Sequence, residues 1–229
     1  MSELASRTYR LGTLLGAASL AGLIAIASGE ALAGGLEELY QTGHCPNCDL
    51  KGVDLYGASL WRANLAAADL SGSEMSQSGL RKANLAGANL QQARLSSADM
   101  LGAELSKSKL NQAELYKVNL SEADLRAADL SGAHIVDADL SGADLTGANL
   151  KDAVLAGSLL VGTVLEGADL SGADLSEADL KGAKLTGAKL SGANLIAANL
   201  EDADLSDVDL SDVNLSGANL SGAKLDAAE

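Results

Sequence analysis

The sequence repeats every five residues over most of its length. From Leu50 to Leu225 every fifth residue is leucine, except where Met75, Met100 and Ile135 take its place. These positions form 36 consecutive apolar centres with no slip in phase. The residue two before each centre is nearly always alanine, and the residue directly before it is usually aspartate or asparagine. A fixed period this short is typical of solenoids.

A five-residue period fits neither an ordinary helix nor a single strand. In an α-helix successive centres would lie about 140° apart, so the leucines would ring the helix. In one strand an odd period would place successive leucines on opposite faces. The leucine and alanine content alone favours helix, but the period is the stronger indication. The chain must therefore turn once per repeat in the same sense, with each centre pointing inward.

The remaining positions of the unit suit a turn at each corner. The centre and the small residue two before it point the same way, as alternate residues of a short extended segment do. The second residue after the centre is glycine in 17 of the 36 units, for example Gly52 and Gly172. A type II turn needs positive φ at its third residue, which glycine supplies without strain.

The unit, seen as Ala-Asp-Leu-Ser-Gly at 168–172, resembles the pentapeptide-repeat family, whose pattern is A(D/N)LXX. The resemblance covers residues 43–227, about four-fifths of the chain. It implies an all-β fold, a right-handed quadrilateral β-helix with four units, or 20 residues, per coil. About nine coils are then expected, with 228–229 left as a tail.

Charges provide a check on the 20-residue coil. Residues 20 apart would be stacked neighbours, where like charges should avoid each other. Five of the outward positions directly before a centre are basic, and each has an acidic residue 20 positions away. These five are Arg94, Lys109, Lys184, Lys189 and Lys224. The pattern agrees with four units per coil, although acids are common enough there to produce it by chance.

Residues 1–33 are expected to be a cleavable signal peptide. Arg7 and Arg10 precede an uncharged apolar stretch, and Ala31-Leu32-Ala33 supplies small residues for cleavage after Ala33. The alternative is an uncleaved membrane anchor, for which the stretch is short. We therefore expect an exported protein of the thylakoid lumen or periplasm, with no membrane attachment after cleavage.

Residues 34–42 are expected to form a short helical cap on the open solenoid end, or else a disordered leader. The chain's two cysteines follow, Cys45 and Cys48. In an exported protein an adjacent pair predicts a disulfide, and the resemblance supports it, since exported cyanobacterial members have a similar His-Cys-x-x-Cys lead-in. A redox site lacks its βαβ setting. A zinc site with His44 lacks a fourth ligand.

Several positions depart from the repeat. Tyr56 and Trp61 are exposed by phase, and Trp61 is one coil from Arg81, which favours stacking of that pair. Ser73 and Ser78 point inward, where their hydroxyls need partners such as backbone carbonyls.

An apolar band interrupts the charged surface between Val154 and Val164. Val154, Leu159 and Val164 occupy outward positions that normally hold Asp or Asn, and Leu160 and Val161 are also taken as outward. Such a band predicts a contact surface, and scattered tolerated substitutions are the alternative.

Composition excludes several classes of function. The formal charge of −15 argues against binding of nucleic acid or anionic membranes. No catalytic residues, cofactor or metal site are expected, because acids recur by period and a flat ladder does not converge on a divalent ion.

Three functions remain. We expect an exported structural or protein-interaction scaffold with a protein partner that the sequence does not identify. One alternative is an acidic mimic of DNA, since the resemblance includes members that bind DNA gyrase in the cytosol. The other is an enzyme or divalent-ion binder. No cap follows Leu225, so a homodimer through the C-terminal coil is a further expectation.

Overall fold

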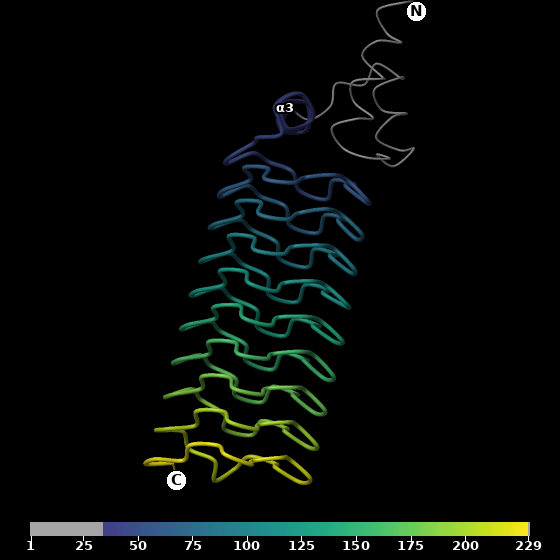
Figure 1. Cartoon of the computed structure of the whole chain (residues 1–229). Helices are drawn as coiled ribbons and strands as arrows, with labels where there is room; N and C mark the ends of the chain where they lie inside the picture. Colours follow the sequence, from purple (N-terminus) through teal and green to yellow (C-terminus); the bar gives the residue numbers. More distant parts are fainter. Residues whose placement is uncertain (1–33, 229) are drawn as a thin grey trace, which may run out of the picture.

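A computed structural model describes residues 34–228, and the expected signal peptide lies outside these residues. The described chain forms a straight rod of stacked coils with one short helix across its N-terminal end (Figure 1). This helix, α3, spans Gly34–Thr42. Within residues 34–228, no helix is long and apolar enough to cross a membrane.

The coils are joined by parallel bridges between residues 20 positions apart. Each outward residue before a centre pairs with its equivalents in the coils above and below, so these bridges form columns along the rod. One column runs unbroken through residues 44, 64, 84, 104, 124, 144, 164, 184, 204 and 224. The predicted coil of four five-residue units is therefore confirmed. Over residues 34–228 the bridges stay isolated and never extend into longer strands, because the chain turns every five residues.

Nearly every corner repeats the same hydrogen bonds. The Leu55 amide donates to the Glu74 carbonyl at 2.7 Å, and the Ala58 amide closes a turn onto the Leu55 carbonyl at 3.0 Å. The second residue after every centre except Leu210 has positive φ, as the glycine pattern predicts. Residues other than glycine adopt this conformation too, as Arg62 does with a φ of 56°. Their left-handed backbone is strained for an L residue, and the bonds between coils on either side hold it in place.

The core is a narrow column of leucine and alanine along the axis of the rod. The centres from Leu50 to Leu205 are buried, and most of the small residues beside them are alanines with no more than 4% exposure. The last centres lack this cover, since residues 34–228 place no further coil against them. Leu225 is 47% exposed. The leucine side chains and the alanines together fill the interior at the close packing expected of a protein core.

One column of bridges is interrupted at the final coil. Among the described residues, Asp209 has no bridge to Lys189, and Asp212 is the one non-glycine corner residue outside the positive-φ set. Val208 and Val213 occupy small inward positions of this coil, where alanine is the rule. Two branched side chains in adjacent small positions need more room than two alanines, which is a physical reason for the missing bridge.

Helix α3 packs onto the first coil. Leu39 and Tyr40 are buried against it, and burial, with a contribution from Asp54, raises the pKa of the Tyr40 hydroxyl. The helix ends at Thr42, and Gly43 follows it with a φ of 74°, which suits the left-handed residue after a helix. The Gly43 amide donates to the Leu39 carbonyl at 2.9 Å. The apolar end of the solenoid is thus covered at its N-terminal side.

Candidate interaction surfaces

The acidic columns are part of the backbone scaffold. In most units the Asp or Asn before the centre accepts a hydrogen bond from the amide two residues later. Asp69 accepts from the Ser71 amide at 3.0 Å and from the Asn89 side chain, one coil below, also at 3.0 Å. The Ser71 hydroxyl and amide lower the pKa of the Asp69 carboxyl. These carboxylates stabilise turns and neighbouring coils, and they lie spread along the rod.

Opposite charges pair along the same columns. The Arg94 guanidinium lies 3.6 Å from the Glu74 carboxylate above it and 3.9 Å from that of Glu114 below it. Lys189 pairs with Asp169 at 3.5 Å. All five predicted basic residues stack against an acid 20 residues away. Arg94, Lys189 and Lys224 also form ion pairs there. All these groups are substantially exposed, so each pair contributes little to stability.

The apolar band exists on the surface, with one correction. Leu159 is 46% exposed and Val161 is 40% exposed, while Val154 and Val164 are partly buried. Leu160 is fully buried, so its placement on the surface was wrong. It stands at a multiple of five, which makes it a repeat centre that points inward. We use the name apolar band for Val154, Leu159, Val161 and Val164.

The buried hydroxyl side chains differ in whether they form hydrogen bonds. Ser158 and Thr163 lie directly inside the apolar band, and their hydroxyls donate to the carbonyls of Ile135 and Leu140. Ser73 and Ser78 have no hydrogen-bond partner for their hydroxyls among the described residues. The expected bonds from these two side chains to backbone carbonyls are therefore absent.

A shallow hollow lies on one side of the first four coils. Its volume is about 340 Å³, and Lys51, Ser71, Gly72, Gln91, Gln92, Asn111 and Gln112 line it. Two amide pairs cross it between coils, Gln91 with Asn111 at 2.9 Å and Gln92 with Gln112 at 3.0 Å. We did not expect this amide ladder, although amides 20 residues apart in the sequence could have indicated it. Four of its lining side chains are thus paired with one another across the coils.

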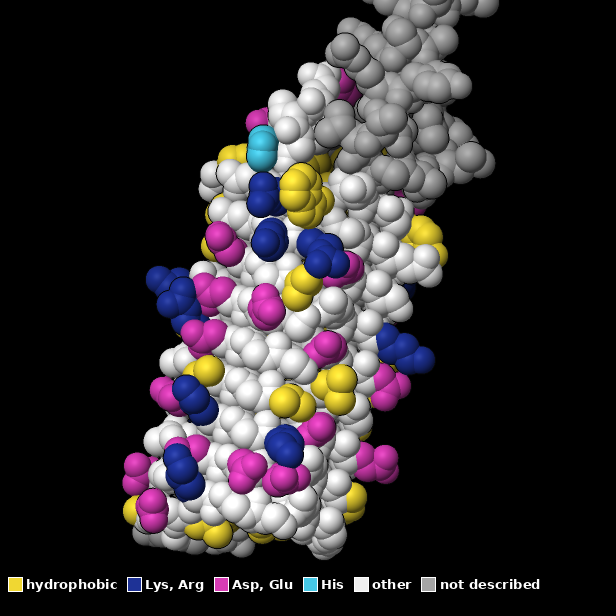
Figure 2. All heavy atoms as spheres, viewed as in Figure 1, with side chains coloured by type: hydrophobic (Ala, Val, Ile, Leu, Met, Phe, Trp, Pro, Cys, Tyr) yellow, Lys and Arg dark blue, Asp and Glu magenta, His cyan; other side chains and the backbone are white. Residues whose placement is uncertain are grey.

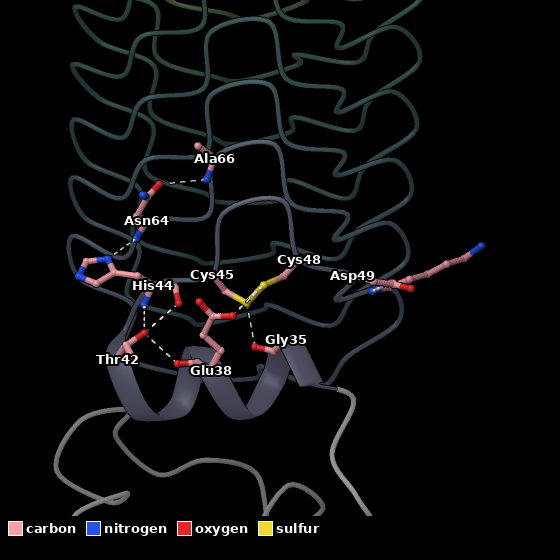
Figure 3. Close-up of a disulfide and its surroundings, with 10 residues drawn as sticks. Gly35, Glu38, Thr42, His44, Cys45, Cys48, Asp49, Asn64 and Ala66 are labelled. Carbon is pink, nitrogen blue, oxygen red and sulfur yellow. Dashed lines mark hydrogen bonds between the residues drawn. A yellow bond between two sulfur atoms is a disulfide. The ribbon is translucent and has the colours of Figure 1, made fainter.

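The disulfide and the cap form one unit at the N-terminal end (Figure 3). Cys45 and Cys48 are bonded, with a Cα–Cα distance of 5.4 Å. A Cβ at Gly35 would lie 2.9 Å from the Cys48 Cβ, so only glycine lets α3 approach this closely. The Glu38 carboxylate lies within 4.8 Å of both sulfurs. Zinc binds thiolates, so the bonded sulfurs do not make this trio a zinc site.

Trp61 is 60% exposed, as predicted, but its partner differs from the expected one. The guanidinium of Arg62, the next residue, lies 4.6 Å from the centre of the indole ring. Arg81 instead pairs with Asp99 at 3.3 Å. The corner turn brings Arg62 over the ring, a local geometry that the repeat phase does not reveal.

Comparisons with known proteins identify the repeat. The sequence model of pentapeptide repeats matches in eight copies, over residues 48–84, 73–112, 113–152, 148–187 and 188–226. A search of curated proteins finds no match.

Solved structures of pentapeptide repeat proteins are similar to this chain. HetL, involved in heterocyst differentiation regulation in the cyanobacterium Nostoc sp. strain PCC 7120, is 34% identical; the match covers 90% of this chain and 94% of HetL, with a TM-score of 0.42. A protein of the Arabidopsis thaliana thylakoid lumen is 35% identical, over 42% of this chain and 61% of its own, with a TM-score of 0.19. QnrB1, a plasmid-mediated fluoroquinolone resistance protein, is 17% identical over 78% and 91%, with a TM-score of 0.46.

Proposed function

Because the chain belongs to the pentapeptide-repeat family, whose members fold as right-handed four-sided β-helices and are generally non-enzymatic scaffolds, we propose that it is a protein-interaction scaffold. The observation that carries this proposal is the apolar band. Leu159 and Val161 are exposed leucine and valine side chains on a rod whose equivalent positions hold Asp139 and Ser141 one coil above. Exposed apolar side chains grouped on a charged surface favour contact with another protein.

The band is small, so it forms the centre of a contact rather than the whole of it. The neighbouring column positions are polar and charged, with Asp139 above Leu159 and Asp179 below it. An apolar centre with a polar rim is the usual anatomy of a protein interface. The straight, rigid rod supports such a role because the band cannot collapse into the filled interior.

The scaffold acts outside the cytosol, in the thylakoid lumen or periplasm. Two features support this part of the proposal: the charge and apolar pattern of residues 1–33, and the Cys45–Cys48 disulfide, a bond typical of oxidising compartments. The corresponding organisation is a signal peptide at 1–33, a cap at 34–42, the repeats at 43–227 and a tail at 228–229.

A comparative purification tests the scaffold role. Tagged full-length chain is recovered from the exported fraction of its own cells beside the double variant Leu159→Asp/Val161→Ser, which carries residues that this column already tolerates at Asp139 and Ser141. The matched control is Leu101→Ser, a change of a partly exposed leucine on the same side of the rod. One partner at fixed stoichiometry should accompany the wild type and the control and be lost from the double variant. Equal recovery with all three chains would reject the band as the contact.

We also propose that two copies associate through their C-terminal coils. Leu225 is 47% exposed there, and the ladder is open at Asp209. A two-fold contact uses one surface twice and closes. The net charge of −15 opposes it, so association should strengthen as added salt screens the repulsion. Sedimentation across a salt series should show this, and a monomer at every salt concentration would reject it.

A further inference from the structure

Two stretches of the repeats that are longer than one coil carry no Asp or Glu. One is residues 180–200, where Lys181 and Lys189 pair with Glu201 and Asp169 of adjoining coils. The other lies near the N-terminal end. Residues 75–98 contain no Asp or Glu, but they contain Arg81, Lys82 and Arg94. The stretch is longer than one 20-residue coil, so it forms a complete belt around the rod near its N-terminal end. A belt free of acids on a chain of net charge −15 is a local reversal of the surface potential.

Two of the three cations of this belt, Arg81 and Lys82, lie at one corner of the rod, and Arg62 lies at the same corner one coil above. One column of bridges beside this corner begins with Ser59 and Gly79, and it carries Asp99 and Asp139 further down the rod. Around the corner, the adjoining column begins with three residues that are not acidic, His44, Asn64 and Asn84. Trp61, Arg62, Arg81 and Lys82 are all exposed between these columns. We call these four residues the basic corner.

Figure 2 shows a group of Lys and Arg side chains beside hydrophobic ones near the N-terminal end of the described rod, with Asp and Glu more frequent below it. Within the basic corner, Arg62 lies 4.6 Å from the centre of the Trp61 ring. Stacking holds a guanidinium flat and leaves its N–H edges free to donate to an oxygen anion. The arrangement offers an aromatic face and a fork of donors together.

Arg81 and Lys82 extend this donor surface by one coil. Arg81 pairs with Asp99 through a single 3.3 Å contact while half of its side chain is exposed. A guanidinium has five N–H donors, so Arg81 keeps donors for a second anion. Lys82 is exposed and stands directly below Arg62 in the corner position.

We propose that the basic corner binds an acidic segment of a partner protein, with carboxylates on Arg62, Arg81 and Lys82 and an apolar side chain against Trp61. This inference rests on the proposed scaffold role and adds a second contact to it. The corner spans two coils, roughly 10 Å of rod at the usual strand spacing. A footprint of that size fits one extended peptide crossing the rod.

A lipid bilayer does not fit the same surface. The side of the rod that carries the basic corner continues with Asp99, Asp139 and Asp179, and with Glu201 and Asp202. A rod lying flat on an anionic membrane would bring all these carboxylates against it, and they would repel it. A peptide that crosses only the first two coils avoids them.

The single tryptophan makes this inference testable. Trp61 is the only Trp of the chain, so its fluorescence reports directly on the basic corner. The probe is a dodecapeptide of alternating Glu and Leu residues, titrated at 100 mM salt, where long-range repulsion by the rod is largely screened. We expect a saturable change in Trp61 emission. The Arg62→Gln/Lys82→Gln variant should bind at least tenfold more weakly, and glutamine already occupies this positive-φ position at Gln77 and Gln92.

The matched control is Arg94→Gln, which removes one cation of the same belt on another side of the rod, where Glu74 and Glu114 flank it. It should bind within twofold of the wild type. The inference is overturned by an absent or unsaturable response, by equal losses in both variants, or by a preference for anionic vesicles over the peptide. It is also overturned if Arg62→Gln/Lys82→Gln abolishes self-association of the rod but leaves peptide binding unchanged. The basic corner would then bind a second copy of this chain. The purification described above separates this inference from the scaffold role. If Arg62→Gln/Lys82→Gln retains the partner and Leu159→Asp/Val161→Ser loses it, the scaffold role stands and the basic corner is not its contact.

Discussion

The hydroxyl of Ser158 inserts into the turn that follows Ile135, one coil above it. Ser158 Oγ donates to the Ile135 carbonyl at 2.5 Å and accepts from the Ala138 amide at 3.1 Å. In the other turns of the described coils, the equivalent amide and carbonyl bond directly, as Ala98 does to Leu95 at 3.0 Å. A buried hydroxyl therefore replaces one backbone bond, directly behind the apolar band.

Ser158→Ala should leave stability nearly unchanged. Without the hydroxyl, the Ala138 amide and the Ile135 carbonyl can bond to each other as their equivalents do, so the cost should stay below about 1 kcal/mol. Urea unfolding measures it, and amide exchange at Ala138 should remain slow. Thr163→Ala is the control, because the Leu140 carbonyl keeps its bond from Ala143. A loss above roughly 2 kcal/mol would mean that the two groups stay unpaired.

Leu125→Asp should unfold or strongly destabilise the rod. Leu125 is fully buried midway along it, and an unpaired carboxylate there should cost at least ~3 kcal/mol. The control is Asp124→Val, which gives this column the residue that it already carries at Val164. That change should cost less than ~1 kcal/mol, since the ion pair with Arg126 is exposed. Equal melting temperatures for the two variants would contradict the inward phase of the centres.

Much of this fold could be predicted from the sequence, and Leu125 and Leu159 show why. Repeat phase alone places Leu125 inside and Leu159 outside, because a uniform five-residue turn assigns one direction to each position. Four units per coil came from the family resemblance and not from the period. The repeat phase could not show that the Ser158 hydroxyl bonds into a neighbouring turn, or that Trp61 stacks with Arg62 and not with Arg81. Side-chain rotamers determine both contacts, and the repeat phase does not specify rotamers. Leu160 was misplaced although its position in the repeat predicts burial.

Asp204 should titrate near pH 2. The Ser206 hydroxyl, the Ser206 amide and then Lys224 bond to its carboxylate and lower its pKa to about 2 from the ordinary value of 3.8. A depressed pKa stabilises the folded state above the unfolded value, so this contribution is complete above pH ~4 and is lost as the pH falls toward 2. NMR titration measures the pKa, which should rise in Ser206→Ala. An unchanged value in that variant would show that the hydroxyl is not the main cause.

Cys45 and Cys48 should be bonded in the exported protein. The native chain should weigh two hydrogens less than its reduced form under non-reducing mass spectrometry, because export exposes the pair to an oxidising compartment. The same chain kept in a reducing cytosol is the control and should be alkylated twice. Two freely alkylated thiols in freshly isolated exported protein would contradict both the bond and the assigned compartment.

Every surface described above depends on the 20-residue coil, and one cross-linking measurement tests it most directly. In a Cys45→Ser/Cys48→Ser background, cysteine pairs are introduced at Asn119 with Asp139, with His134, or with Asp144. Asn119 and Asp139 are bridged neighbours, about 4.8 Å apart at the usual strand spacing, within reach of a disulfide. Mild oxidation should join this pair rapidly and leave the other two reduced. Preferential joining of 119 with 134 or with 144 would mean three or five units per coil, and would contradict the account.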